Sequence, residues 1–271
     1  MRIALAQITS GTDPAANLHT VEEYTRLAAA DGARLVVFPE AAMCRFGVSL
    51  RAVAESLDGP WADGVRRAAA ANGTTVVAGM FCPSGDGRVT NTLIAAGPDV
   101  DSHYDKIHLY DAFGFAESKT VAPGSDPALI DVDGVAVGLT TCYDIRFPEL
   151  YVELALRGAQ VFTVSASWGS GPGKLDQWTL LARARALDTA GFVAAAGQAY
   201  PGDEIAAAGP TGVGGSLIAS PYGEVLSAAG ADPQLLIYDI DIATVHTARD
   251  TLAVLHNRSE FTQPDKAESR G

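Results

Sequence analysis

Residues 135–165 read VAVGLTTCYDIRFPELYVELALRGAQVFTVS, and this stretch decides the fold. An apolar strand is expected over Val135–Thr141, and it runs directly into Cys142. A helix is expected over Glu149–Leu156, and a second apolar strand over Val161–Ser165. In α/β proteins functional residues gather just past the carboxyl ends of strands. The stretch therefore predicts an α/β layer with a cysteine at its functional edge.

Outward from this stretch, the hydrophobic pattern keeps switching between strand-like and helix-like periods. Further helices are expected over Asp13–Ala30, Trp61–Ala71 and Leu175–Thr189, and one from about Asp241. The other expected strands are Arg2–Ile8, Arg34–Phe38, Thr74–Phe81, Arg88–Ala96, Val100–Tyr104, Ala128–Val132, Phe192–Ala196, Gly215–Ala219, Val225–Ser227 and Leu235–Ile240. Roughly ten to twelve strands, some in hairpins, favour two mixed sheets packed face to face with helices outside. No linker interrupts the pattern, so we expect a single domain over residues 1–271.

Charge and cysteine content exclude several classes of protein. The chain has 271 residues, a formal net charge of −13 and a pI of about 4.7. Nucleic acids and anionic membranes attract basic surfaces, so neither is an expected partner. Cys44, Cys82 and Cys142 form no C-x-x-C pair, which favours a reducing compartment. The sequence contains no signal-peptide pattern and no transmembrane-length apolar run, and we expect a cytoplasmic protein.

Three reactive side chains follow expected strands. Glu40 comes after RLVVF and one proline, Lys106 lies in HYDKIHLYD, and Cys142 ends VAVGLTT. Taken singly, they have ordinary interpretations: an exposed loop carboxylate, a solvated lysine and a buried structural cysteine. Cys142 differs from the other two cysteines because Asp144 and Arg146 follow it at once, and a plain core strand carries no such charges.

The combination is more informative than its parts. VVFPEAAMCRFG surrounds Glu40, YDKIHLYDAFGFAES surrounds Lys106, and TTCYDIRFPELY surrounds Cys142. In this order the three segments resemble the signatures of the nitrilase superfamily of carbon–nitrogen hydrolases, and the resemblance covers nearly the whole chain. The segment CYDIRFPEL is typical of the Nit-type amidases, the branch with the ω-amidases and the deaminated glutathione amidases.

This resemblance implies a catalytic triad of Glu40, Lys106 and Cys142, with Glu117 as a second glutamate beside it. It also implies an α-β-β-α sandwich with two mixed six-stranded sheets, which pairs into a four-layer homodimer or a higher homo-oligomer. The helix at Phe147–Leu156 would help to form the dimer interface, and residues 258–271 would be a loose or interface tail.

The residue types fit amide hydrolysis on chemical grounds. A cysteine is a good nucleophile toward a carbonyl when a base takes its proton, and Glu40 is the candidate base. Lys106 and the backbone N–H of Tyr143 are candidates to stabilise the oxyanion. The product of the first step is a thioester at Cys142, and Glu117 would orient the lysine or the water.

Two further residues are candidates for substrate binding. Arg146 either holds a substrate carboxylate, as an arginine does in a related carbamoylase branch, or pairs with Asp144 to brace the turn after the nucleophile. Trp168 follows the strand Val161–Ser165 and either lines the pocket or packs in the core.

The expected function is that of an amidase that acts on small linear carboxamides, including those that carry a carboxylate. An N-carbamoyl amino acid hydrolase and a nitrilase share the triad and remain alternatives, and a non-catalytic binding protein of the same fold is a further one. No G-x-S-x-G elbow, phosphate-binding loop or zinc-ligand spacing is present, so we expect no metal and no cofactor.

Overall fold

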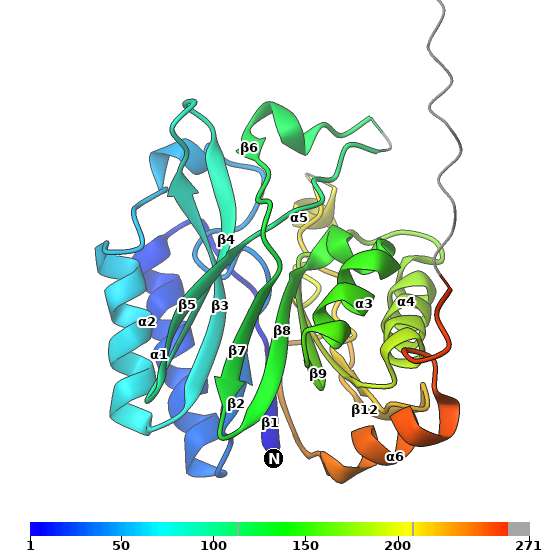
Figure 1. The fold of residues 1–271 in the computed structure, drawn as a ribbon. Helices are drawn as coiled ribbons and strands as arrows, with labels where there is room; N and C mark the ends of the chain where they lie inside the picture. The colour runs from blue at the N-terminus through cyan, green and yellow to red at the C-terminus, as the bar shows by residue number, and fades with distance from the viewer. Residues whose placement is uncertain (113, 208, 260–271) are drawn as a thin grey trace, which may run out of the picture.

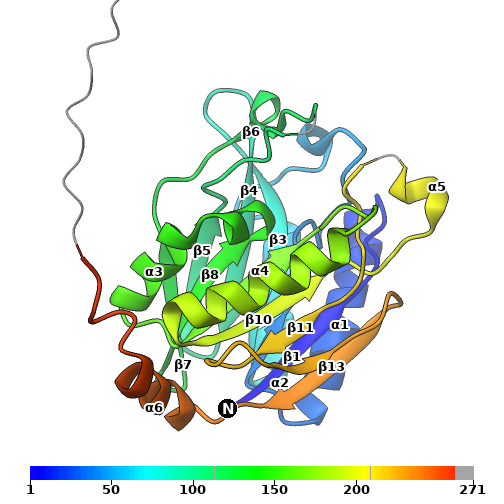
Figure 2. The same ribbon diagram turned by 90° about the vertical axis from the view of Figure 1, so that its right-hand side faces the viewer.

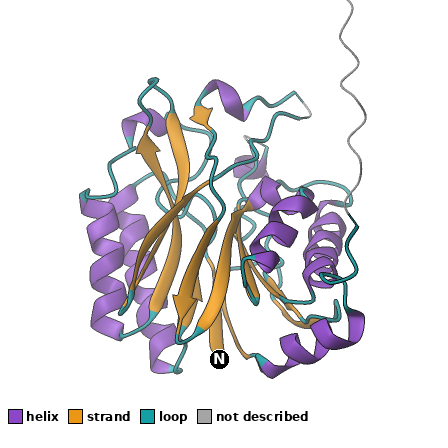
Figure 3. Cartoon of the chain, in the orientation of Figure 1, coloured by secondary structure: helices purple, strands orange, loops and turns teal. Residues whose placement is uncertain are grey.

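The computed structural model describes residues 1–112, 114–207 and 209–259. Two mixed β-sheets lie face to face, and helices cover the outer face of each (Figures 1 and 3). This is the expected α-β-β-α sandwich. The expected C-terminal tail lies outside the described residues from position 260 onward.

The first sheet contains the first and the last strand of the described chain. Its strands, in spatial order, are β13 (Gln234–Asp239), β1 (Arg2–Gln7), β2 (Leu35–Val37), β3 (Thr75–Pro83), β4 (Val89–Gly97) and β5 (Val100–Asp105). A seventh strand, the two-residue β6 (Val121–Ala122), pairs with β4 and was not expected from the sequence. The pairs β1–β2 and β2–β3 are parallel and the others along the path are antiparallel, so the sheet is mixed as predicted.

The second sheet has six strands, as predicted. In spatial order they are β12 (Val225–Ala228), β11 (Leu217–Ala219), β10 (Phe192–Gly197), β9 (Val161–Ala166), β8 (Val135–Thr141) and β7 (Ala128–Val132). The three central strands run parallel, and hairpin partners close both edges.

The helices form the outer layers. They are α1 (Pro14–Ala30), α2 (Pro60–Asn72), α3 (Pro148–Leu156), α4 (Lys174–Thr189), α5 (Asp203–Ala206) and α6 (Ala243–Leu252), with 3₁₀ turns η1 (Leu50–Ala52), η2 (Glu117–Lys119) and η3 (Cys142–Arg146). Asp13 caps the start of α1, because its carboxylate accepts a hydrogen bond from the Ala15 amide at 2.9 Å. Helices α1 and α2 pack on the first sheet, and α3 and α4 on the second (Figures 1 and 2).

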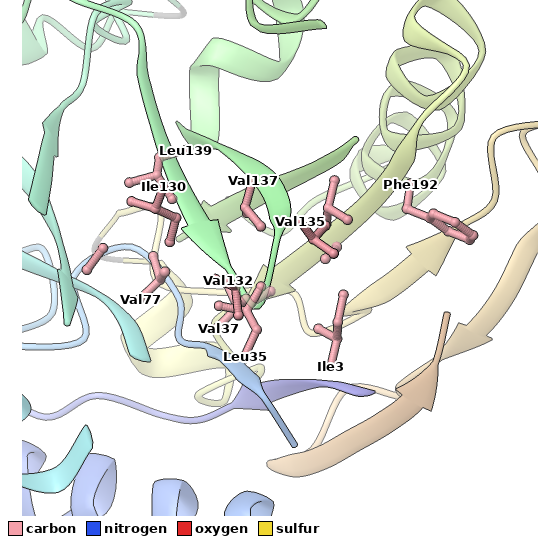
Figure 4. Close-up of a cluster of buried hydrophobic side chains, with 14 of the residues drawn as sticks. Ile3, Leu35, Val37, Val77, Ile130, Val132, Val135, Val137, Leu139 and Phe192 are labelled. Carbon is pink, nitrogen blue, oxygen red and sulfur yellow. The ribbon is translucent and has the colours of Figure 1, made fainter. Parts of the chain in front are cut away.

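Branched aliphatic side chains fill the space between the sheets. Figure 4 shows Ile3, Leu35, Val37 and Val77 of the first sheet facing side chains of the second sheet, among them Val137. All five are fully buried. Because successive residues of a strand point to opposite faces, the alternate residues of these strands pack under the helices instead.

One end of the sandwich gathers the segments that the sequence predicts to be functional. Strands β2 and β5 run in the same direction within the first sheet, as β8, β9 and β10 do within the second. Their carboxyl ends lead into the loops at the top of Figure 1, beside β6 and α5. Within the described part of the chain, no helix is long and apolar enough to cross a membrane.

Candidate active site

Glu40 follows β2 in a turn that its neighbours hold tightly. Its side chain is 1% exposed. The next residue, Ala41, has φ +59°, in the left-handed region that a residue with a Cβ rarely adopts. The Gln198 amide nitrogen donates to the Glu40 carbonyl oxygen at 3.0 Å. Gly79 of β3 leaves room for the turn, because a Cβ there would lie 2.6 Å from the Ala41 nitrogen. Gly79 and the side-chain amide of Gln198 therefore fix the backbone turn that carries the Glu40 carboxylate.

Lys106 places its ammonium between two carboxylates. The side chain is 2% exposed, and Nζ donates to Glu40 Oε1 at 2.9 Å and to the two Glu117 oxygens at 3.1 and 2.9 Å. Burial by itself lowers the pKa of Lys106, but the negative charges of Glu40 and Glu117 outweigh it and raise the pKa above its ordinary value. The side chain stays a positively charged donor and is not available as a base.

Groups that the sequence did not single out complete the bonding of the two carboxylates. Asn91 of β4 is fully buried, and its Nδ2 donates to Glu40 Oε1 at 2.8 Å and to Glu117 Oε1 at 3.2 Å. The Ser167 amide donates to Glu40 Oε2 at 2.8 Å, and the Tyr110 amide donates to Glu117 Oε2 at 2.7 Å. An asparagine inside an expected strand, where this residue type is uncommon, was a signal for Asn91, whereas backbone donors leave none in the sequence.

Cys142 lies directly after β8, where the 3₁₀ turn η3 begins. Its φ of +45° is the second left-handed value at the site. Burial and the negative charge of Glu40 raise the pKa of Cys142 well above its ordinary value, with a contribution from a hydrogen bond to Glu40, although Lys106 acts in the opposite direction. The free site therefore holds a thiol, and its use as a nucleophile requires a base.

Arg146 does not pair with Asp144, so the bracing alternative raised by the sequence is wrong. Its Nη2 donates to Gln177 Oε1 at 2.9 Å, and its guanidinium carbon lies 5.2 Å from the centre of the Trp168 ring. The Asp144 carboxylate is fully buried and accepts from other donors. Trp168 lines a cavity and also packs on Trp178, with ring centres 5.5 Å apart. It is therefore both a pocket residue and a core residue, the two places that the sequence offered for it.

These groups line one cavity of about 500 Å³. Residues from both sheets contribute to it, because it lies where the loops after β2, β5, β8 and β9 meet. Among its lining residues are the reactive Glu40, Lys106, Glu117 and Cys142, the aromatic Phe46, Tyr110, Phe115, Tyr143 and Trp168, and the basic Arg146 and Lys174. The volume suits a small organic molecule rather than a polymer.

The other cysteines keep their ordinary interpretation. Cys44 is buried, with Sγ 3.6 Å from the carbonyl oxygens of Thr12 and Arg45. Burial raises the pKa of Cys82, on β3, to about 11. Among the residues that the structure describes, no group of three or more His, Cys, Asp and Glu side chains is arranged to hold a metal ion.

Comparison with known proteins places the chain in a family. The sequence profile of the carbon–nitrogen hydrolases matches residues 2–250, and the chain belongs to this family. A protein of Mycobacterium tuberculosis (strain H37Rv) that is named a hydrolase is 68% identical over the whole of both chains. The deaminated glutathione amidase of Escherichia coli O157:H7 is 38% identical over 88% of each chain.

A solved structure agrees with both the fold and the family. The NitN amidase from Neterenkonia sp. AN1 superimposes with a TM-score of 0.80 at 28% identity, over 95% of this chain and 96% of that one. A mutant of that amidase, 27% identical here, shows acrylamide added to its active-site cysteine. The predicted membership of the nitrilase superfamily, close to the Nit-type amidases, is thus confirmed, and the protein is a carbon–nitrogen hydrolase of the amidase kind.

Proposed function

We propose that the protein hydrolyses a small linear carboxamide to a carboxylate and ammonia through a thioester at Cys142. The observation that carries this proposal is the buried contact of Lys106 Nζ with Glu40 and Glu117 in the cavity that Cys142 also lines. A charged pair held this tightly is costly to bury, and a structural role would be served as well by apolar side chains. Its place beside a cysteine supports nucleophilic catalysis.

Glu40 is the proposed base, and its Oε2 is the oxygen that moves the proton. Oε1 already accepts from Lys106 and Asn91, whereas the donor to Oε2 is the Ser167 amide, which leaves a lone pair of Oε2 for the thiol proton. As Sγ of Cys142 attacks the carbonyl carbon, its proton passes to this carboxylate. The same proton then goes to the amide nitrogen as the C–N bond breaks, so that ammonia leaves as a neutral molecule.

The tetrahedral intermediate carries one negative charge on oxygen. The Lys106 ammonium and the Tyr143 amide are the proposed donors to it, each worth on the order of 3 kcal/mol in the transition state. In the second half of the reaction Glu40 takes a proton from water, the hydroxide adds to the thioester, and the C–S bond breaks. Cys142 regains its proton and the acid product leaves. Glu117 keeps Lys106 in place throughout.

Arg146 and Trp168 form one wall of the cavity, and this wall supports a substrate that carries a carboxylate. The guanidinium of Arg146 lies over the Trp168 ring on the lining of the cavity, where it can make a two-pronged contact with a carboxylate. An N-carbamoyl amino acid meets the same arginine, and for this reason it stays the second candidate substrate. A nitrile lacks the carboxamide oxygen, but its carbon could be attacked by the same cysteine, and it stays a further alternative.

Ammonia release from a panel of compounds tests the proposal. The panel contains ω-amides of dicarboxylic acids, simple aliphatic amides, N-carbamoyl amino acids and aliphatic nitriles, with Cys142→Ala as the blank. Turnover of ω-amides that the variant lacks supports the proposal. Preference for carbamoyl compounds or nitriles replaces the substrate class and keeps the triad. Equal rates with Cys142→Ala contradict the triad, and a protein that binds amides without turnover is a binding protein of the same fold.

We also propose that the chain acts as one domain and forms a homodimer through α3 and α4. Leu156 of α3 and Leu180 of α4 are 56% and 64% exposed, which is unusual for leucines on neighbouring helices. A second copy of the chain is the partner that the family resemblance suggests. Light scattering tests this, and a monomer contradicts it.

A further inference from the structure

The Asp144 side chain, two residues after Cys142, joins segments that are far apart in the sequence. It is fully buried, and its carboxylate accepts four hydrogen bonds. Oδ2 accepts from the Thr141 amide at 2.9 Å and from the Tyr104 hydroxyl at 2.7 Å. Oδ1 accepts from the backbone amide and from Nδ1 of His108, at 3.0 and 2.8 Å.

The partners of this carboxylate fix the hydrogen positions. An ionised carboxylate only accepts hydrogen bonds, so Nδ1 of His108 carries a hydrogen. Burial, together with the charge of Asp144, raises the pKa of Tyr104 well above its ordinary value, and the hydroxyl keeps its hydrogen and donates. The His108 ring also stacks on Phe147, with ring centres 3.7 Å apart and planes 7° from parallel.

The network connects the two sheets at the catalytic edge. Thr141 is the last residue of β8 in the second sheet, and Tyr104 belongs to β5 in the first. His108 lies two residues after Lys106, and Asp144 lies two residues after Cys142. The pair His108–Asp144 is therefore a direct bridge between the lysine segment and the nucleophile turn, whose strained φ at Cys142 needs surrounding contacts to hold it.

We propose that His108 and Asp144 form a latch that positions the Cys142 thiol relative to the Lys106 ammonium. The proposal rests on the proposed amidase function. Neither residue is among those that line the described part of the cavity, so both act through the groups they hold and not on the substrate. A nucleophile and a charge donor must be kept within about 0.5 Å of their working geometry, which is the task the latch performs.

Two substitutions separate the hydrogen bond of His108 from the stacking of its ring. His108→Asn keeps an N–H close to the place of Nδ1 and removes the ring, whereas His108→Phe keeps the ring on Phe147 and removes the N–H. His103→Asn is the matched control, because His103 is exposed on β5. Each variant is first checked for a cooperative melting transition, and only folded protein is compared.

The readouts are kcat and KM for the best amide of the panel, and the rate at which iodoacetamide alkylates Cys142. For His108→Phe we expect kcat and the alkylation rate to fall about 10- to 100-fold, with KM within about twofold. For His108→Asn we expect both rates within about threefold of wild type. A purely structural role would lower the melting temperature and leave the rates of the folded protein unchanged.

Wild-type kcat and alkylation in folded His108→Phe overturn the latch, and so does an equal loss in both His108 variants. If His108→Phe does not fold, Tyr104→Phe replaces it: loss of one donor to Asp144 should slow alkylation a few-fold, and an unchanged rate contradicts the latch. The alkylation arm needs no substrate. A wild-type protein without amide turnover therefore refutes the proposed function, while the alkylation rates still decide on the latch.

Discussion

The floor and the wall of the cavity are built in different ways. On the floor, Lys106 and Glu40 are buried, Glu117 is 10% exposed, and their charged atoms meet donors or acceptors of the protein. On the wall, Arg146 is half-buried, lies over the Trp168 ring and donates a hydrogen bond to Gln177. Under the proposed function, the comparison teaches that the floor would set the reaction, because its groups are held by many contacts, and that the wall would set which substrate enters.

The largest effect is expected on the floor, from Glu40→Gln. The amide cannot accept the thiol proton, and its NH₂ group must face a donor from either Lys106 or Ser167. We expect kcat to fall about 10²- to 10⁴-fold, measured by ammonia release. Glu149→Gln, at an exposed glutamate of α3, is the control and should leave the rate unchanged.

The same variant has a second signature. The charge of Glu40 helps to raise the pKa of Cys142, so its removal lowers that pKa, and alkylation should reach its plateau at lower pH than in wild type. A profile that stays in place or moves to higher pH would show that the carboxylate does not act on the thiol.

The next effect concerns stability. Lys106→Met leaves the carboxylates of Glu40 and Glu117 buried without their cation. Breaking a buried ion pair from one side costs about 3–5 kcal/mol in the free energy of unfolding. Urea denaturation measures it, with Lys119→Met at an exposed site as the control. A loss below about 1 kcal/mol would mean that the floor behaves like an exposed ion pair, and its contrast with the wall would disappear.

A smaller and selective effect is expected on the wall. Arg146→Met keeps packing against Trp168 and removes the guanidinium. We expect kcat/KM for carboxylate-bearing amides to fall about 10- to 100-fold, the equivalent of a lost charged hydrogen bond, and kcat/KM for neutral amides to stay within about threefold. An equal loss for both kinds of amide would place Arg146 with the floor.

The sequence predicted the layers because they depend on local patterns, whereas the catalytic triad is implied by the family resemblance and stays a prediction. Periodicity and turn residues located the strands. Strand ends marked Glu40, Lys106 and Cys142 only as candidates, the resemblance grouped them, and the structure places all three at one cavity. The sequence did not predict the short β6, which depends on pairing with β4, or the backbone donors of Ser167 and Tyr110. It left the partner of Asp144 open and offered Arg146, the nearest basic residue in the chain. Long-range contacts with β5 and the loop after it decide otherwise.

The smallest effect compares Cys142 on the floor with Cys82, which lies outside the cavity lining that the structure describes. Burial raises both thiol pKa values above the ordinary 9.0, that of Cys82 to about 11 and that of Cys142 well above the ordinary value. A raised thiol pKa means that the folded state keeps a proton that the unfolded chain has lost. The contribution of each thiol to stability is therefore complete below pH 9 and declines as pH rises toward the folded pKa.

The difference in free energy of unfolding between wild type and Cys142→Ala should fall by at most about 1.4 kcal/mol per pH unit above pH 9. For Cys82→Ala the same decline should end near pH 11. Urea denaturation at a series of alkaline pH values measures both. The charge of Glu40 helps to raise the pKa of Cys142 but not that of Cys82. In a Glu40→Gln background, the loss of stability from Cys142 should therefore end at a lower pH than in wild type, whereas the loss from Cys82 should end at the same pH. Equal behaviour of the two cysteines in that background would mean that burial alone sets the state of the nucleophile, and that the charges of the floor do not reach it.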